Sequence, residues 1–469
     1  MKPELELSDF ITSLVSADAT DATLETARRV LLASVGAGIA GASEDGISQL
    51  RHLLGARGGA HEARTFMFGT RVPAHAAAQF NGTLCRALDF CDALAPGAHL
   101  GSSVIPAAFA AAELVGGCSG AELLAALVVG CEVGARFNLT ESMYDGFDPT
   151  GVAVVFGSTA AAARVLGLSA KQTTSALGLA LNRCGGSFQS NIDGTLAVRV
   201  IQGWVAQTGV ECAQLAAAGI TGPENFLTGA YGYAHLFGRG RLDAASLTAS
   251  LGREWRMNEI VFKKYPSCGA TQGLTELTLG LVARHDLAPE RIERVDIRLN
   301  PYCHRLVGGD FRVGDNPRVN AQFSAQYCAA SAIARGSASL RHFRPGEIAD
   351  ATVQQLIRKV QCTGDRDLDA RGHTAVDVTI ATRGGVEHFA QLDIAPGFPG
   401  NALSSGQHAE RFNDCMDYAE HRLPARQVDA FLDGVARLGE LPDARILVDC
   451  LIAPAASSEP HVDIERTEI

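Results

Sequence analysis

The chain is poor in aromatic and charged side chains. Aromatic residues make up 6% of its 469 residues and charged residues 19%, while 47% are hydrophobic. Even so, no stretch reaches the roughly 18 unbroken apolar residues of a membrane-spanning helix. The N-terminal sequence MKPELELSDF also lacks the basic start and apolar run of a signal peptide. We therefore expect a globular cytoplasmic protein without a membrane span, long enough for two domains.

Motifs for metals and cofactors are missing as well. The chain has 12 cysteines, but none forms a C-x-x-C pair or a zinc-like grouping with histidine. There is no P-loop, no G-x-S-x-G elbow and no G-x-G-x-x-G after a predicted strand. The sequence therefore predicts no disulfide framework, no metal and no cofactor.

Positive charge is in short supply. Lys and Arg number 40 against 51 Asp and Glu, and the formal net charge is −11. Without a basic stripe to neutralise phosphates, a nucleic-acid partner is excluded. An anionic small molecule would need a local cationic pocket in a negatively charged protein.

Helical periodicity dominates the first 255 residues. Leu, Val and Ala recur at i, i+3 and i+4 in residues 24–41, 119–137 and 169–182. Ser119 followed by Glu122 predicts a capping box at the start of the second of these helices.

The pattern changes after about residue 265. Polar and apolar residues alternate in 291–300, as in a half-buried strand, and again in 373–385 and 386–395 around a Gly-Gly turn. We expect the last two segments to form a hairpin. Helical patterns lie between these strands and return after 406.

Residues 80–106, FNGTLCRALDFCDALAPGAHLGSSVIP, carry the strongest chemical signal. Asp89 and Asp92 lie three residues apart, His99 lies in a glycine-rich turn, and Pro106 is expected to open an alanine-rich helix. Titratable groups on a short loop held by apolar helices suit acid/base chemistry on a small molecule. The alternative is that the aspartates cap a helix and the histidine is a surface residue.

The same segment resembles the signature of the MmgE/PrpD family: NGT, a D-F-D-D run, a histidine and a V-[IL]-P-A helix start. Further blocks follow in the family's order. They are GFDPTG at 146–151, AGITGP at 218–223, FKKYPSCGATQ at 262–272 and AQFSAQYCAASAIARG at 321–336. The family includes 2-methylcitrate dehydratase, cis-aconitate decarboxylase and iminodisuccinate epimerase.

The resemblance implies a mainly α fold, a large all-helical domain with an inserted smaller α+β lid. Residues 1–265 and 399–469 would form the helical domain and residues 266–398 the lid. It also implies a homodimer and an active site in the cleft between the two units, where domain interfaces often place pockets.

The resemblance also suggests which side chains are catalytic. His99 matches the family's loop histidine, and Asp89 and Asp92 match the ends of the D-F-D-D run. Lys263 matches the lysine before Y-P. Asp148 stands where the family has the histidine of G-F-H-P-T.

Five further residues are expected to bind substrate. Arg199 follows Gly194-Thr195, where the family carries a lysine, and two cations would suit a dicarboxylate or tricarboxylate. Cys268 and Gln272 stand where family members have histidines. Tyr302 and His304 lie in the region that supplies a lid tyrosine.

The expected function is a cofactor-independent lyase, a dehydratase or decarboxylase, acting on a small carboxylic acid. The alternatives are an epimerase or isomerase, which needs two proton-transfer groups on opposite faces of an acidic carbon, and a repurposed member. Asp148 adds negative charge beside an anionic substrate. It is therefore expected to pair with Arg199 or to face a cationic or hydroxyl group of the substrate.

Overall fold

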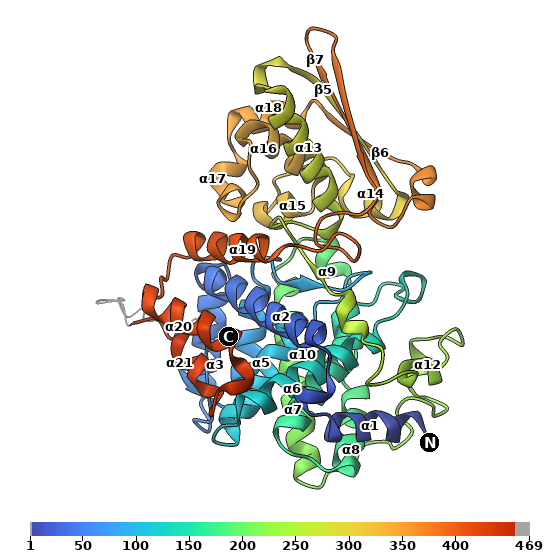
Figure 1. The fold of residues 1–469 in the computed structure, drawn as a ribbon, viewed down its shortest axis with the longest axis vertical. Helices are drawn as coiled ribbons and strands as arrows, with labels where there is room; N and C mark the ends of the chain where they lie inside the picture. The colour runs from blue at the N-terminus through green and yellow to red at the C-terminus, as the bar shows by residue number, and fades with distance from the viewer. Residues whose placement is uncertain (1, 455–469) are drawn as a thin grey trace, which may run out of the picture.

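The computed structural model describes residues 2–454, which form two packed units (Figure 1). One hydrophobic core joins residues from 7 to 262 with residues from 403 to 451, and a second core runs from Cys268 to Ile380. We call residues 2–265 with 399–454 the body, and residues 266–398 the lid. The predicted fold class, a mainly α protein with a smaller α+β unit, is confirmed.

The body is a bundle of closely packed helices. Its central pair, α4 and α10, approaches closely because glycines face each other across the contact. A Cβ atom on Gly203 would lie 2.3 Å from the carbonyl oxygen of Gln79. The body helices are α1 (Pro3–Ser13), α2 (Asp21–Ala40), α3 (Ile47–Arg57), α4 (Ala74–Arg86), α5 (Gly101–Leu114), α6 (Gly120–Phe137), α7 (Val155–Val165), α8 (Ala170–Leu181), α9 (Gln189–Ile192), α10 (Ala197–Ala217), α11 (Tyr233–Leu236), α12 (Ala245–Thr248), α19 (Ser405–Tyr418), α20 (Ala425–Ala436) and α21 (Arg445–Cys450).

The helices predicted from periodicity are present as α2, α6 and α8. The capping box at α6 is confirmed. The Glu122 amide donates to Ser119 Oγ over 3.2 Å, and the Ser119 amide donates to Glu122 Oε2 over 2.9 Å. Among residues 2–454 no single helix is long and apolar enough to cross a bilayer. Helices α2 and α3 reach that length and composition only when they are taken together, and the chain bends by 92° between them.

The expectation for the start of α5 is wrong. The helix begins at Gly101, and Pro106 lies inside it. The carboxylate of Asp92 accepts the backbone N–H groups of Leu100 and Gly101 over 3.0 Å each. This cap lies nine residues upstream of the helix, so a search for a local N-cap misses it.

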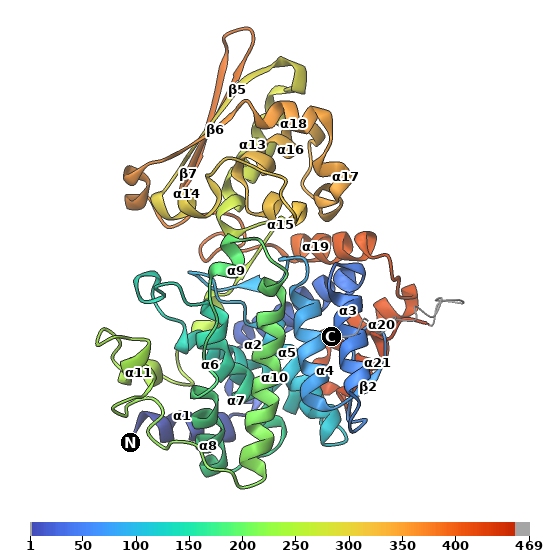
Figure 2. The same ribbon diagram turned by 180° about the vertical axis from the view of Figure 1, so that it is seen from behind.

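The lid is a four-stranded sheet with helices against one face (Figure 2). Its strand order is β6-β5-β7-β8. β5 and β6 are parallel, and the other pairs are antiparallel. The predicted strand at 291–300 and the predicted hairpin are confirmed as β5 and as β7 with β8. The lid elements are α13 (Gln272–His285), β5 (Ile292–Leu299), α14 (Pro301–Val307), α15 (Pro317–Gln322), α16 (Ala325–Arg335), α17 (Pro345–Ile348), α18 (Ala351–Ile357), β6 (Val360–Gly364), β7 (Val376–Thr382) and β8 (Glu387–Leu392).

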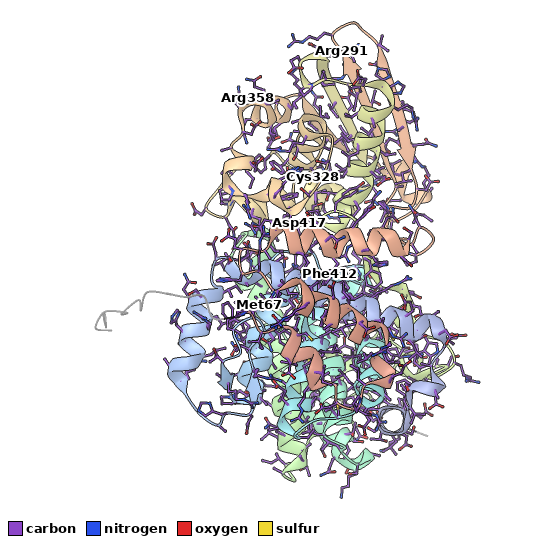
Figure 3. All side chains as sticks on the ribbon, turned by 60° about the vertical axis from the view of Figure 1, so that its left-hand side comes forward. Met67, Arg291, Cys328, Arg358, Phe412 and Asp417 are labelled. Carbon is purple, nitrogen blue, oxygen red and sulfur yellow. The ribbon has the colours of Figure 1, made fainter. Side chains whose placement is uncertain are left out.

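Two elements join the units. Strand β3 (Asp92–Ala93) of the body pairs antiparallel with β4 (Val261–Phe262), which leads into the lid. Helix α19 lies across the top of the body beneath the lid, with Phe412 on its body side (Figure 3). Its Arg411 donates to the backbone carbonyls of Lys263 and Phe90. These contacts hold the loop after α4 against the start of the lid. A further short pair, β1 (Ala63–Arg64) with β2 (Arg71–Val72), lies at the edge of the body.

Candidate active site

A cavity lies where the body meets the lid. It holds about 840 Å³ of empty space, part of it open to solvent. Body, junction and lid all contribute to its wall. Six of the ten residues expected in the site line it: Asp89, His99, Asp148, Lys263, Cys268 and Tyr302.

Asp89 is the centre of a buried charge cluster in this wall. Its Oδ1 accepts a hydrogen bond from Lys263 Nζ over 2.7 Å and forms an ion pair with Arg86 Nη1 over 2.5 Å. Lys263 Nζ also donates to the Asp89 carbonyl over 2.7 Å. Burial alone would raise the pKa of Asp89, but the two cations hold it well below its usual range. Asp89 is therefore an anion that fixes both cations in place.

The backbone at Asp89 is in the left-handed region, with φ at 52°. Aspartate tolerates this conformation better than most residues, yet it is uncommon outside glycine. The turn follows directly on α4, whose last residue is Arg86, so the chain reverses and brings the carboxylate back to the guanidinium. The turn aims Asp89 at the cavity while Asp92, three residues on, points to α5.

His99 is held in one tautomer. Its Nδ1 lies 2.6 Å from the backbone carbonyl oxygen of Asp92. A carbonyl only accepts, so Nδ1 carries the proton and Nε2 carries the lone pair, which faces the Arg86 guanidinium, a donor. Nε2 lies 3.2 Å from Arg86 Nη2 and 3.9 Å from Asp89 Oδ1. Burial lowers the pKa of His99 well below its ordinary value, and Arg86 and Lys263 lower it further. The imidazole is thus neutral at physiological pH, as a general base requires.

Asp92 lies behind His99 and does not line the cavity. Its carboxylate caps α5 and also accepts from Ser34 Oγ over 3.3 Å. Asp92 therefore orients His99 through its backbone carbonyl and not through its side chain. Asp89 therefore faces the cavity, as the acid/base interpretation of the sequence expects. Asp92 caps a helix, as the structural interpretation expects.

Asp148 faces the cavity just before a π-helical turn, Thr150–Val154. Its Oδ1 accepts the amide of Gly151 over 2.9 Å. Burial raises the pKa of Asp148, although this hydrogen bond and the charge of Arg86 act in the opposite direction. The expected pair with Arg199 does not form. Asp148 is therefore the carboxyl group of this wall that keeps its proton to a higher pH than an exposed aspartate does.

Arg199 lies outside the cavity, contrary to expectation. It donates to the carbonyl of Asp45 over 2.9 Å and lies 4.0 Å from Glu44. Consecutive residues of a helix point about 100° apart, so its neighbour Val198 faces the cavity instead. An apolar side chain therefore occupies the place where the sequence suggested a cation.

Gln272 and His304 also lie outside the cavity. The Gln272 side chain accepts from the Tyr265 amide over 2.9 Å and donates to the Tyr265 and Ser267 carbonyls, so it fixes the loop before α13. His304 and Tyr302 are two residues apart on α14, and such residues do not share a helix face. Only Tyr302 points to the cavity, where its hydroxyl donates to the Pro96 carbonyl over 2.7 Å.

Cys268 belongs to the lid wall of the cavity. Burial raises the pKa of its thiol to about 11, although Lys263 lowers it in part. The thiol is therefore neutral at physiological pH. It can donate a weak hydrogen bond but is a poor base.

Arg86 and Gln202 were missed by the sequence analysis. Both are buried, and both line the cavity. Gln202 donates to Thr150 Oγ1 over 3.2 Å, and the same hydroxyl accepts the amide of His99 over 3.0 Å. The available signal was a charged residue, Arg86, within the apolar run FNGTLCRAL, three residues before Asp89.

Three buried polar atoms of the wall have no hydrogen-bond partner among the described residues. They are Asp89 Oδ2, Arg86 Nε and Gln202 Oε1. Buried polar atoms are nearly always paired, so these three are candidate contacts for a bound molecule. Across residues 2–454 no group of three or more His, Cys, Asp or Glu side chains is arranged to hold a metal ion.

Comparison with known proteins identifies the family. The model of the MmgE/PrpD N-terminal domain matches residues 5–244, and the model of the C-terminal domain matches residues 265–436. The chain belongs to the MmgE/PrpD family. The C-terminal match includes α19 and α20, which pack in the body although they follow the lid in sequence.

Relatives of this chain carry names of one enzyme type. The cis-aconitate decarboxylase-like protein oryM of Aspergillus oryzae is 29% identical over 401 residues, 78% of this chain and 81% of the relative. The cis-aconitate decarboxylase of Homo sapiens is 25% identical over 472 residues, 96% of this chain and 95% of the relative. The cis-aconitate decarboxylase of Mus musculus is 25% identical over 463 residues, 94% of this chain and 91% of the relative. These relatives support an enzyme of the lyase type.

Proposed function

We propose that this protein is a cofactor-independent lyase that removes CO₂ or water from a small carboxylic acid in the cavity between body and lid. The observation that carries the proposal is His99 Nε2. It is a neutral imidazole nitrogen in a buried wall, with its tautomer fixed by the Asp92 carbonyl and its lone pair facing Arg86 Nη2. The names of the relatives favour decarboxylation over dehydration.

Arg86 and Lys263 are proposed to hold the substrate carboxylate. Both are buried, and together with Asp89 they carry two positive charges and one negative charge, which leaves one positive charge for the substrate. A guanidinium and an ammonium both donate charge-assisted hydrogen bonds to a carboxylate. The unpartnered Arg86 Nε is a donor for this purpose, and Asp89 Oδ2 can accept from a substrate hydroxyl.

His99 and Asp148 are proposed to move the protons. In dehydration, His99 Nε2 takes a proton from carbon, the electron pair forms the double bond, and the C–O bond breaks. Protonated Asp148 then gives its proton to the departing hydroxide, which leaves as water. In decarboxylation of an unsaturated acid, Asp148 gives a proton to an alkene carbon. The electron pair of the breaking carbon–carboxylate bond rebuilds a double bond as CO₂ leaves. A lowered pKa keeps His99 neutral and able to accept a proton, and a raised pKa lets Asp148 keep its proton to a higher pH.

An epimerase is the second candidate. His99 of the body and Cys268 of the lid line the same cavity from different units, as two proton-transfer groups on opposite faces of a carbon would. The neutral thiol would act as the donor and the neutral imidazole as the acceptor.

The deciding assay follows the purified protein with a panel of hydroxy acids and unsaturated acids in heavy water. Release of CO₂ or formation of an alkene, followed by NMR, supports the lyase. Deuterium at carbon with inverted stereochemistry, and neither CO₂ nor alkene, supports the epimerase instead. A folded protein that does neither with any acid that it binds contradicts both proposals.

We also propose a homodimer in the cytoplasm. Two large apolar side chains, Trp204 on α10 and Leu53 on α3, are 52% and 49% exposed and line one surface hollow. Light scattering after size exclusion is expected to give twice the chain mass, and Trp204→Glu to lower it. A monomer at micromolar concentration contradicts the proposal.

A further inference from the structure

The wall of the active-site cavity is divided by polarity. Arg86, Asp89, His99, Asp148 and Lys263 gather on the side of the body and the junction. The remaining wall is largely apolar and contains Leu94, Phe188, Val198, Val261, Leu306, Phe323 and Phe398. Small-molecule sites commonly combine an apolar wall with a few polar groups that fix orientation. The apolar part of this wall could contact a substituent much larger than a methyl group.

A second cavity adjoins the apolar side. It is formed by α9, the end of α14 and residues 309–324, and it holds about 1170 Å³ of empty space, part of it open to solvent. Four side chains line both cavities: Phe188, Asn191, Leu306 and Phe323. Three of the four are apolar and none is charged. An alkyl chain extending from the reacting end could therefore pass these side chains on its way toward the surface, into a cavity that Arg305, Asp310 and Arg312 also line.

The cationic side of the wall is small. Arg86 and Lys263 are its two cations, and both are bonded to Asp89. Val198 takes the position facing the cavity while Arg199 points away, and Cys268 is a neutral thiol. The other arginines near by, Arg305 and Arg312, line the second cavity, so a second or third carboxylate within the first cavity would lie without a cation of its own, and a buried unpaired charge costs several kcal/mol.

We propose that the substrate is a monocarboxylic acid with an apolar substituent of several carbons. Its carboxylate lies at Arg86 and Lys263, and its substituent lies on Phe188, Leu306 and Phe323 and extends toward the second cavity. The assignment of the reacting end rests on the proposed function. The assignment of the apolar end rests on the wall alone.

The test is calorimetric binding of saturated acids, which cannot react by elimination or decarboxylation of an alkene. The probes are the straight-chain monocarboxylates from butanoate to decanoate, together with butanedioate and propane-1,2,3-tricarboxylate. Affinity is expected to rise about fourfold for each added methylene, the equivalent of ~0.8 kcal/mol per buried CH₂. The di- and tricarboxylate are expected to bind more weakly than hexanoate. A flat series, or tightest binding of the tricarboxylate, overturns the inference.

Variants of the wall show where the apolar substituent of the ligand lies. Phe323→Ala and, as a second variant at the same wall, Leu306→Asn are expected to flatten the dependence on chain length. Phe389→Ala is the matched control, because Phe389 also belongs to the lid but is 56% exposed on strand β8. It is expected to keep the full dependence. An unchanged dependence in both wall variants, with melting curves like that of the wild type, would place the substituent elsewhere and overturn the inference.

The two proposals fail in different ways. A rising affinity series without turnover of any matching unsaturated or hydroxy acid removes the lyase and keeps the apolar-tail site. Efficient turnover of polycarboxylates with a flat series keeps the lyase and removes the apolar-tail site.

Discussion

The body and the lid contribute different kinds of side chain to the same cavity. The body supplies Arg86, Asp89, His99 and Asp148, each held by hydrogen bonds or ion pairs within the body or at the junction. The lid supplies Cys268, Tyr302, Leu306 and Phe323, which bring bulk and a neutral surface. Lys263 lies between them, at the end of β4.

This division follows from how each unit is packed. The body is built of closely packed small residues, and such a scaffold fixes charged groups with little freedom to move. The lid touches the cavity with α14 and the turn after α15, which are short elements over a separate core. The body is thus suited to position the proton-transfer groups, and the lid to select the substrate's shape.

The largest expected effect is on His99. For an acid that reacts by loss of a proton from carbon, His99→Ala is expected to lower kcat by roughly 10²-fold or more, because a general base contributes about that much. The measurement is steady-state turnover of the best acid from the panel. His304→Ala is the control, since His304 is on the lid helix α14 and faces away from the cavity. Equal turnover of the wild type and a folded His99→Ala protein would remove the histidine from the mechanism.

The next effect concerns the junction lysine. Lys263→Ala is expected to raise the apparent KM by roughly 10- to 100-fold, because a charge-assisted hydrogen bond contributes about 1.5–3 kcal/mol. Its sequence neighbour gives a close control. Lys264 pairs with Glu276 over 2.7 Å on the lid side and does not line the cavity. Equal rises in KM for Lys263→Ala and Lys264→Ala would show that the junction matters only for folding.

Asp148 is expected to set the alkaline side of the pH profile. Because its pKa is raised, the acid form persists above the ordinary carboxyl range, and kcat is expected to fall as pH rises through the raised value. Asp148→Asn is expected to lower kcat by roughly tenfold to 100-fold and to abolish this limb. A limb that is unchanged in the asparagine variant would assign the titration to another group.

The same residue affects which acids react. An aspartate in place of the family's histidine makes the cavity less basic, so 2-methylcitrate and cis-aconitate are expected to be poor substrates. Asp148→His is expected to improve the turnover of at least one of them. Assays of both proteins on both acids test this, and efficient wild-type turnover of either acid would contradict it.

The acidic side of the profile is expected to reflect His99. Its pKa is lowered, so the imidazole stays neutral as pH falls through the range where an exposed histidine becomes protonated. The kcat/KM value is therefore expected to change little between pH 7.5 and about 6. A threefold or larger decrease in kcat/KM over that interval would contradict this if the residual activity of His99→Ala does not show it. The histidine would then titrate in its ordinary range.

The sequence predicted the fold well because helix period, strand alternation and capping are local signals. Helices α2, α6 and α8 and the hairpin of β7 and β8 follow directly from them. The site was only partly predictable, because the direction of a side chain depends on packing. Val198 and Arg199 are neighbours in sequence, and only the contact of α10 with α4 decides which faces the cavity. The same holds for Asp89 and Asp92, which a left-handed turn separates.

The smallest effect on catalysis is expected at Arg199. Its guanidinium joins the Asp45 carbonyl and lies near Glu44, and Glu44 also pairs with Arg318 of the lid and accepts from the Tyr418 hydroxyl over 2.9 Å. Arg199→Ala removes one member of this buried group, so it is expected to lower the free energy of unfolding by about 1–3 kcal/mol. KM is expected to stay within about twofold of the wild type, because the side chain does not line the cavity. Thermal melting with and without the best-binding monocarboxylate separates the two effects. The melting temperature is expected to fall, while the stabilisation by ligand stays the same. A large rise in KM at unchanged stability would instead place Arg199 at the substrate and add a cation to the apolar part of the wall where Val198 lies, which would remove the difference in polarity between the two parts of the wall.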